Sequence, residues 1–292
     1  MALRAKTVLI AVVVALAASG CSQPAGSRPP SAVPTPPTTL GRSHPVGIVA
    51  IGHSGLTGEN SDPNLPGQPA LANSWATGSS PQVDSVYLRL VAARRETKGH
   101  VVNTATGGAP VASLVEQAHT ALARVPAPAL IIIQTIDSDI QCNGTDATNV
   151  VMFGATLMRV LKSLTASSPK SKILLVGQLG RPSSTFVTTL ISKHPEVKAS
   201  LTGPGICDFY DEQGRLNTGS FAALTQIIDS YEAEQAKVCA TVGNCSTDNG
   251  VRAAYTDTPE NFTSDWNHLN LRGQAREAKI IWPLVSSVLG LN

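Results

Sequence analysis

A serine near the start of the folded part of the sequence and an Asp-x-x-His group near its end have the residue types of a nucleophilic site. Ser54 lies in the glycine-rich segment GHSGLTG at 52–58, and Asp265 and His268 are three residues apart. A serine hydroxyl becomes a nucleophile when a base takes its proton and a carboxylate orients that base. Each feature alone also fits a tight turn or a locally hydrogen-bonded loop. The hypothesis of a Ser-His-Asp site therefore rests on their combination.

The elements that must bring these residues together alternate along the chain. Apolar runs typical of strands lie at 46–51, 101–102, 129–135, 173–178 and, more weakly, 251–255. Amphipathic segments typical of helices lie at 84–95, 111–124, 148–167, 183–194, 218–238 and 271–281. This alternation predicts an α/β fold, a three-layer α/β/α sandwich around a parallel sheet of about five strands. Functional residues are expected at the carboxyl ends of those strands.

The run at 129–135 is apolar at consecutive positions, which predicts a central strand covered on both faces. A proline at position 283, directly after Trp282, predicts a break in the last helix. Between the serine turn and the first helix, the segment 62–80 is rich in Pro, Asn and Gly and contains Trp75. Two interpretations of this segment stay open: one wall of the substrate cleft, or simple packing on the domain.

Composition excludes several other classes of protein. The chain has 292 residues, of which 42% are apolar and 14% charged, so it is not disordered as a whole. It has 22 basic and 20 acidic residues, and two of the basic ones, Arg4 and Lys6, precede residue 21. The remaining charges balance, which argues against a nucleic-acid-binding surface or a polybasic membrane patch.

The first 20 residues are typical of an export signal, because two basic residues precede an apolar run at 8–18 that is too short to span a bilayer. Its end, ASGC at 18–21, resembles the lipobox of bacterial lipoproteins. That resemblance implies lipidation of Cys21 and anchoring to the outer face of the bacterial cell membrane. The alternative is an ordinary signal peptide with no role for Cys21. Residues 21–45 contain seven prolines and are expected to form an extended tether, which leaves 46–292 as the folded domain.

Export places the other four cysteines in an oxidising compartment, where an even number favours disulfides. Cys239 and Cys245 are close enough in sequence to pair locally, and Cys142 with Cys207 follows by elimination, although the sequence permits three connectivities. A zinc site is the alternative, but the chain has no Cys-x-x-Cys and no histidine at ligand spacing. We therefore expect two disulfides, no metal ion and no cofactor.

The Gly-x-Ser turn, the Asp-x-x-His group and the α/β frame together resemble the SGNH (GDSL-like) hydrolase family over nearly all of 46–292. The resemblance implies a flavodoxin-like sandwich with Ser54 as nucleophile, His268 as general base and Asp265 as its carboxylate partner. The chain departs from the motif at His53, where the family usually has Asp. The implied reaction is hydrolysis of a carboxylic ester in an acylated lipid or an acetylated glycan, through an acyl-enzyme on Ser54.

The resemblance also assigns an oxyanion hole. The segment NTATGG at 103–108 looks like the block whose glycine N–H enters that hole, and the spacing favours Gly108. The segment IDSD at 136–139 stands where the family has Gly-x-Asn-Asp, so Ser138 replaces the oxyanion asparagine. Loss of one such donor typically costs about 2.7–4 kcal/mol in the transition state. We expect the N–H groups of Ser54 and Gly108 to carry most of the hole, in a slow or specialised esterase.

Other functions stay open beside hydrolysis. The chain could keep the fold and bind an envelope glycan or lipid without turnover, or it could transfer the acyl group to a sugar hydroxyl. Asp137, Asp139 and Asp146 are compatible with a cation site, but they are expected to close a loop and cap the helix that follows.

Overall fold

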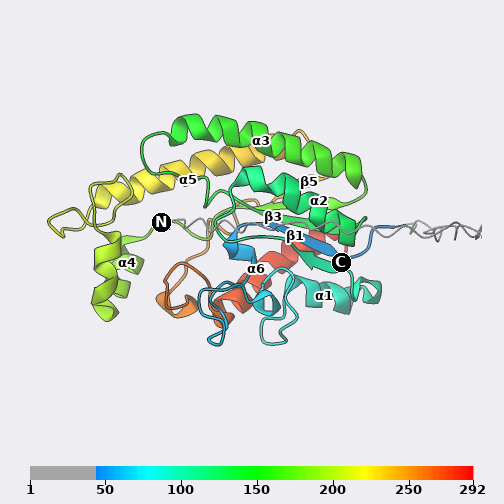
Figure 1. The fold of residues 1–292 in the computed structure, drawn as a ribbon, viewed down its shortest axis with the longest axis horizontal. Helices are drawn as coiled ribbons and strands as arrows, with labels where there is room; N and C mark the ends of the chain where they lie inside the picture. The colour runs from blue at the N-terminus through cyan, green and yellow to red at the C-terminus, as the bar shows by residue number, and fades with distance from the viewer. Residues whose placement is uncertain (1–43, 292) are drawn as a thin grey trace, which may run out of the picture. The chain divides into compact units, whose positions relative to one another are not determined.

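The chain forms a three-layer α/β/α sandwich, seen as a ribbon in Figure 1. The structure is a computed structural model that describes residues 44–291. The predicted signal peptide, Cys21 and nearly all of the tether lie outside the described residues. Five parallel strands form one sheet in the order β2-β1-β3-β4-β5. The predicted fold class is therefore confirmed.

The sheet is built from short strands whose carboxyl ends lie together. The strands are β1 Ile48–Gly52, β2 Val101–Asn103, β3 Leu130–Gln134, β4 Lys172–Val176 and β5 Cys245–Thr247. In the register of the central strands, Gly52 lies opposite Gln134, and Gln134 lies opposite Val176. The loops that follow these three residues therefore start side by side, which is where an α/β fold places its site.

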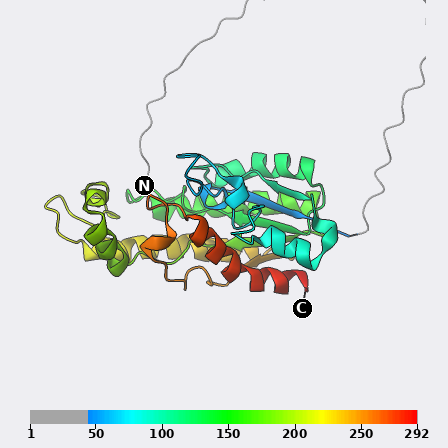
Figure 2. The same cartoon turned by 90° about the horizontal axis from the view of Figure 1, so that it is seen from below.

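Helices cover both faces of the sheet (Figures 1 and 2). On one side lie α2 Leu114–Arg124, α3 Asp146–Ser167 and α5 Thr218–Cys239, and on the other lie α1 Val86–Ala93 and α6 Leu271–Leu289. A further helix, α4 Ser184–Lys193, lies beyond the carboxyl ends of the strands. Short 3-10 helices occur at Ser54–Leu56, Leu71–Asn73, Arg95–Thr97, Val111–Ser113, Pro195–Leu201 and Pro259–Asn261.

The alternation of side chains along the strands fills two cores. In β3, Ile131 and Ile133 pack with α2, α3 and α5, whereas Leu130 and Ile132 pack with α1 and α6. All four are fully buried. This double coverage confirms the interpretation of 129–135 as a central strand, and it explains why that run is apolar at every position.

Among the described helices, α3 alone is long and apolar enough to cross a membrane by length and composition. Its buried residues, including Phe153, Leu157 and Leu161, pack in the core that it shares with α2 and α5. The interior of this domain therefore explains part of its apolar composition, whereas Val151 and Met152 are exposed.

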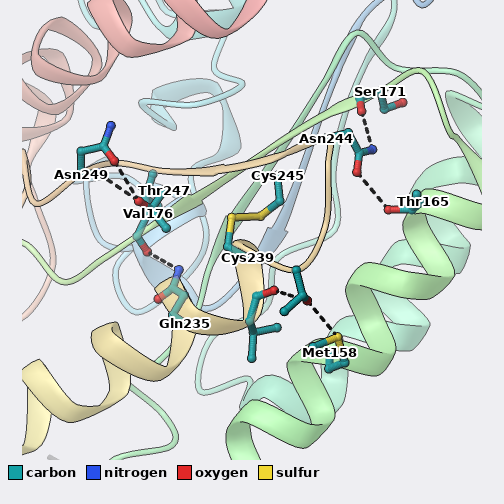
Figure 3. The surroundings of a disulfide bond; sticks show 12 residues. Met158, Thr165, Ser171, Val176, Gln235, Cys239, Asn244, Cys245, Thr247 and Asn249 are labelled. Carbon is teal, nitrogen blue, oxygen red and sulfur yellow. Dashed lines mark hydrogen bonds between the residues drawn. A yellow bond between two sulfur atoms is a disulfide. The ribbon is translucent and has the colours of Figure 1, made fainter.

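The fifth strand was predicted at the wrong place. Residues 251–254 form turns, and the edge strand is β5, Cys245–Thr247. Its residues are half-buried and mostly polar, so no apolar run marks it. As Figure 3 shows, Asn244 fixes the start of this strand by donating to the Ser171 carbonyl at 2.8 Å and accepting from Thr165 Oγ1 at 3.1 Å.

The predicted break at Trp282-Pro283 is also wrong. Helix α6 continues through Pro283 to Leu289 and ends at Gly290, whose φ of +59° gives a left-handed C-cap. Proline removes one backbone donor, but Ile281 and Val285 on either side of it are fully buried against the sheet. Packing of this apolar face therefore holds the helix together across the proline.

Both predicted disulfides are present. Cys142–Cys207 has a Cα–Cα distance of 5.7 Å, and Cys239–Cys245 has one of 5.4 Å. The second bond joins the end of α5 to the start of β5 (Figure 3). The first ties the loop after β3 to the segment that follows α4, so both bonds restrain loops around the sheet.

Candidate active site

Ser54 lies on a rigid turn directly after β1. Gly52 has a φ of +145°, and a Cβ placed there would lie 1.8 Å from the Gln134 carbonyl oxygen, so only glycine fits. The turn is closed by His53, whose N–H donates to the Gln134 carbonyl at 3.1 Å and whose Nδ1 accepts from Gly55 N at 3.1 Å. The Ser54 side chain is thereby held at the carboxyl end of the central strands.

Ser54 and His268 are 214 residues apart in sequence, yet the structure brings them into contact. His268 Nε2 lies 2.8 Å from Ser54 Oγ, and His268 Nδ1 lies 2.7 Å from Asp265 Oδ2. The histidine loop is closed by Thr263 N donating to the His268 carbonyl at 2.8 Å, and Asn270 caps the helix α6 that follows. The three residues predicted from the sequence thus form one hydrogen-bonded chain.

The Asp265 carboxylate accepts hydrogen bonds at both of its oxygens. Oδ1 accepts from Thr263 Oγ1 at 2.6 Å and from the backbone N–H groups of Asn267 and His268 at 2.9 and 3.0 Å. Oδ2 accepts from His268 Nδ1 and from Asn60 Nδ2. Burial raises the pKa of Asp265, but these hydrogen bonds outweigh burial and hold the pKa well below its usual range. The group is therefore a stable carboxylate beside His268.

Sequence reasoning did not identify Asn60 as part of this site. It follows the serine turn in a left-handed conformation, with φ of +60°. Its Oδ1 accepts from Gly67 N, which orients the amide so that Nδ2 faces Asp265. The contact with Asp265 spans 205 residues of sequence. No periodic pattern could indicate it.

His53 stays neutral in the site. Burial lowers the pKa of its imidazole to about 4; the charge of Asp137 opposes that shift, and Arg252 adds to it. Because Nδ1 accepts from Gly55 N, the ring proton lies on Nε2. This histidine, at the position where the motif usually has Asp, therefore caps the serine turn as an uncharged group.

A buried ion pair supports the turn from beneath. Arg252 Nε lies 2.5 Å from Glu277 Oε1, and the two side chains are only 3% and 1% exposed. Arg252 also donates to the Gly177 carbonyl, and the Gln134 amide oxygen, turned toward it, accepts from both Nη atoms at 3.1 and 3.2 Å. The carboxamide of Gln134 in turn lies against Gly55. Sequence reasoning assigned no role to Arg252 or Glu277.

Replacement of Arg252 by Met is expected to lower the free energy of unfolding by about 3–5 kcal/mol, because it leaves the Glu277 carboxylate buried without its partner. The double variant Arg252→Met/Glu277→Leu removes both charges and is expected to recover most of this loss. Urea unfolding of the two variants and the parent chain measures the difference. A double variant that is less stable than Arg252→Met would contradict this interpretation of the pair.

A cavity of about 190 Å³ opens beside the serine. Its lining is mostly polar and includes His53, Ser54, Gly55, Gln134, Asp137, Gln178, Leu179, Arg252, Phe262, Asn267, His268, Leu269 and Gln274. This volume is below the roughly 300–1,000 Å³ of pockets that enclose drug-sized ligands. The cavity therefore suits a small or short group next to the nucleophile.

Of the residues predicted for the oxyanion hole, Ser54 alone is among those that line this cavity. Gly108 lies in an exposed turn after β2, with φ of +69°, and Ser138 is half-buried in the turn after β3. The oxyanion roles of Gly108 and Ser138 stay predictions. Ile136, at the start of the turn after β3, has a positive φ of +94°, which a β-branched residue rarely adopts.

The remaining polar candidates have structural partners. The Asp139 carboxylate accepts from Val111 N at 3.0 and 3.1 Å, and Asp146 accepts from the N–H groups of Gln141 and Cys142 at 2.8 and 2.9 Å. Of these three aspartates, only Asp137 lines the cavity. Within residues 44–291, no group of three or more His, Cys, Asp or Glu side chains could hold a metal ion.

Trp75, in the segment 62–80, is fully buried and packs beneath the nucleophile turn. Its Nε1 donates to the Gly55 carbonyl at 3.0 Å, and its backbone N–H donates to Gln274 Oε1 at 2.9 Å. For this tryptophan the packing interpretation is therefore confirmed.

Solved structures share this fold. The chain matches a protein described as a GDSL-like lipase from Parabacteroides merdae with a TM-score of 0.51 and 14% identity, over 85% of this chain and 97% of that one. It matches an extracellular lipase from Streptomyces rimosus with a TM-score of 0.50 and 17% identity, over 83% and 99% of the two chains. A family two carbohydrate esterase from Clostridium thermocellum, solved with cellohexaose, gives a TM-score of 0.53 and 12% identity, over 85% and 65%.

These likenesses show the fold alone, which this chain shares with the two lipases and the carbohydrate esterase. No family model and no curated protein matches the sequence. The assignment of chemistry therefore depends on the residues of this chain.

Proposed function

We propose that this protein is an exported, lipid-anchored serine esterase that cleaves carboxylic esters through an acyl-enzyme on Ser54. The observation that carries the proposal is the chain of contacts from Ser54 Oγ to His268 Nε2 at 2.8 Å and from His268 Nδ1 to Asp265 Oδ2 at 2.7 Å. These residues lie at the carboxyl end of the sheet, and Ser54 and His268 line a cavity there. The likeness in fold to lipases and carbohydrate esterases supports the same reaction class.

In the proposed mechanism, His268 carries out each proton transfer. His268 Nε2 takes the Ser54 proton as Oγ attacks the ester carbonyl, and it then gives that proton to the leaving alcohol. Water, deprotonated by the same nitrogen, attacks the acyl-enzyme carbonyl. As the bond to Ser54 Oγ breaks, His268 returns this proton to Oγ, and the acid is released. Asp265 fixes the tautomer and stabilises the imidazolium. In this proposal the N–H groups of Ser54 and Gly108, with the Ser138 hydroxyl, face the oxyanion.

The anchor is the second part of the proposal. Small residues at 18–20 before Cys21 support lipidation of that cysteine, and the proline-rich segment 21–45 supports a tether. At about 3.1 Å per residue, such a tether reaches several tens of ångströms from the membrane. Mass spectrometry of the protein isolated from bacterial membranes tests the lipid anchor. A diacylglyceryl group on Cys21 is expected, and an unmodified chain that begins at another residue would contradict the anchor.

The pH dependence of ester hydrolysis follows from the electrostatics of His268. Burial lowers the pKa of His268, but the hydrogen bond and charge of Asp265, together with the charge of Glu59, outweigh burial and raise it above its ordinary value. The base must be neutral to take the Ser54 proton. We therefore expect kcat/KM to fall about tenfold per pH unit below an apparent pKa that lies above about 6.5.

A pH–rate profile with a neutral ester measures this pKa. Glu59→Gln removes one of the negative charges that raise the pKa of His268, so its profile is expected to shift to lower pH. Full activity of the parent chain well below pH 6 would contradict a base at His268.

A second candidate function is acyl transfer or ligand binding on the same fold, favoured by Ser138 where the motif has asparagine and by its absence from the cavity lining. Hydrolysis of p-nitrophenyl acetate and butyrate by the full chain, with and without a sugar acceptor, separates the candidates. Free acid is expected with and without the acceptor, and none is expected from His268→Ala. An acylated sugar would favour transfer, and no turnover by folded protein would favour a binding protein.

A further inference from the structure

Two side chains in the wall of the cavity have no part in the proposed chemistry. Asp137 is exposed and lines the same cavity as Ser54 and His268. Across the cavity wall, Gln178 Nε2 donates to Asp137 Oδ1 at 3.4 Å. This distance is long for a hydrogen bond, which typically measures about 2.9–3.0 Å between N and O. Both groups therefore keep hydrogen-bonding capacity for a ligand.

Hydrogen bonds to neighbouring groups position the backbone of both residues. Asp137 lies in a turn closed by Asp139 N, which donates to the Ile136 carbonyl at 2.8 Å. The backbone N–H of Gln178 donates to Glu232 Oε1 on α5 at 2.8 Å, and Glu232 also pairs with Arg181. Such pre-organisation reduces the entropy that binding would otherwise cost.

The amide of a third side chain, Gln134, lines the same cavity. The Gln134 amide oxygen accepts from Arg252, so its amide nitrogen is turned away from that guanidinium. The wall of the cavity thus combines an acceptor-only carboxylate, Asp137, with the amides of Gln134 and Gln178. A hydroxyl group both donates and accepts, so hydroxyl groups complement this wall, whereas an alkyl chain would leave its polar groups unpaired.

We propose, on the basis of the esterase function above, that Asp137 and Gln178 form a subsite for hydroxyl groups of the leaving alcohol. The enzyme then prefers acyl esters of sugars or other polyols to esters of apolar alcohols. The alcohol side is assigned because His268 must protonate the leaving oxygen, and Asp137 and Gln178 line the same cavity as His268.

A neutral alcohol fits this subsite better than a quaternary ammonium group. Among the lining residues, Phe262 is the one aromatic side chain other than the histidines, so the aromatic cage typical of choline sites is missing from the described residues.

The test compares 6-O-acetylglucose with cyclohexylmethyl acetate, which has the same acyl group and a ring without hydroxyls. The ratio of their kcat/KM values is expected to favour the sugar ester by about tenfold or more. Asp137→Leu and Gln178→Leu are each expected to lower that ratio about tenfold, and Asp137→Asn less, because its amide oxygen still accepts. Gln226→Leu, which makes the same chemical change as Gln178→Leu on the exposed surface of α5, is the matched control and is expected to keep the parent ratio.

An unchanged ratio in Asp137→Leu would overturn the subsite, and so would a parent chain that prefers the apolar ester. Preference for acetylcholine over its neutral isostere, 3,3-dimethylbutyl acetate, would overturn the assignment to hydroxyl groups. NMR titration of both acetates into Ser54→Ala measures the subsite without turnover. Binding of the sugar ester that Asp137→Leu abolishes in this background supports the subsite even if the parent chain proves not to be an esterase, and equal binding overturns it.

Discussion

Replacement of Ser54 by alanine is expected to lower kcat/KM for p-nitrophenyl acetate by about 10⁴-fold or more, because no other group can form the acyl-enzyme. The described hydrogen bond of the Ser54 hydroxyl is to His268, so its removal leaves the turn after β1 intact. The free energy of unfolding is expected to change by less than about 1 kcal/mol.

Ser230→Ala is the matched control, because it makes the same chemical change on the exposed surface of α5. Its kcat/KM is expected to equal that of the parent chain. If Ser54→Ala retained more than a tenth of the parent activity while folded, the nucleophile would have to be another group.

Asp265→Asn is expected to lower kcat by about 10³–10⁴-fold while the fold is retained. An asparagine amide at this position donates to His268 Nδ1, which places the ring proton on Nε2. That nitrogen faces Ser54 Oγ at 2.8 Å and can then no longer accept the serine proton. Stopped-flow and steady-state measurement of the same ester in both proteins checks this effect.

The variant Asn60→Ala is expected to lower kcat less than Asp265→Asn does. It removes one donor from the carboxylate but leaves Thr263 and the backbone N–H groups of Asn267 and His268 in place. The loss in kcat is expected to be about tenfold, close to the worth of one hydrogen bond to a charged group. Asp265→Asn with activity equal to Asn60→Ala would contradict the tautomer argument.

Much of the fold could be predicted from sequence because burial leaves a periodic pattern. The apolar runs near Ile48–Gly52, Leu130–Gln134 and Lys172–Val176 are central strands covered on both faces, so each was recognisable on its own. The edge strand Cys245–Thr247 is half-buried and polar, and its position depends on contacts of Asn244 rather than on hydrophobicity. Such a strand has no local signal.

The site residues likewise include some with a local sequence signal and some without one. Ser54, Asp265 and His268 could be proposed because their types and local spacing suggest one chemistry, and the structure brings them together. The roles of Asn60 and Asp137 could not be predicted, because both depend on contacts between turns that are far apart in the sequence. The ion pair of Arg252 and Glu277 was missed for a related reason: charged residues are usually exposed, and burial in pairs is seen only in three dimensions.

The most direct test of a nucleophile at Ser54 is covalent labelling of the full chain with a fluorophosphonate, followed by peptide mapping by mass spectrometry. The account predicts one label per chain, on the peptide that contains Ser54, with labelling strongly slowed in His268→Ala and absent in Ser54→Ala. A folded parent chain that stays unlabelled, or a label that maps to another residue, would contradict it.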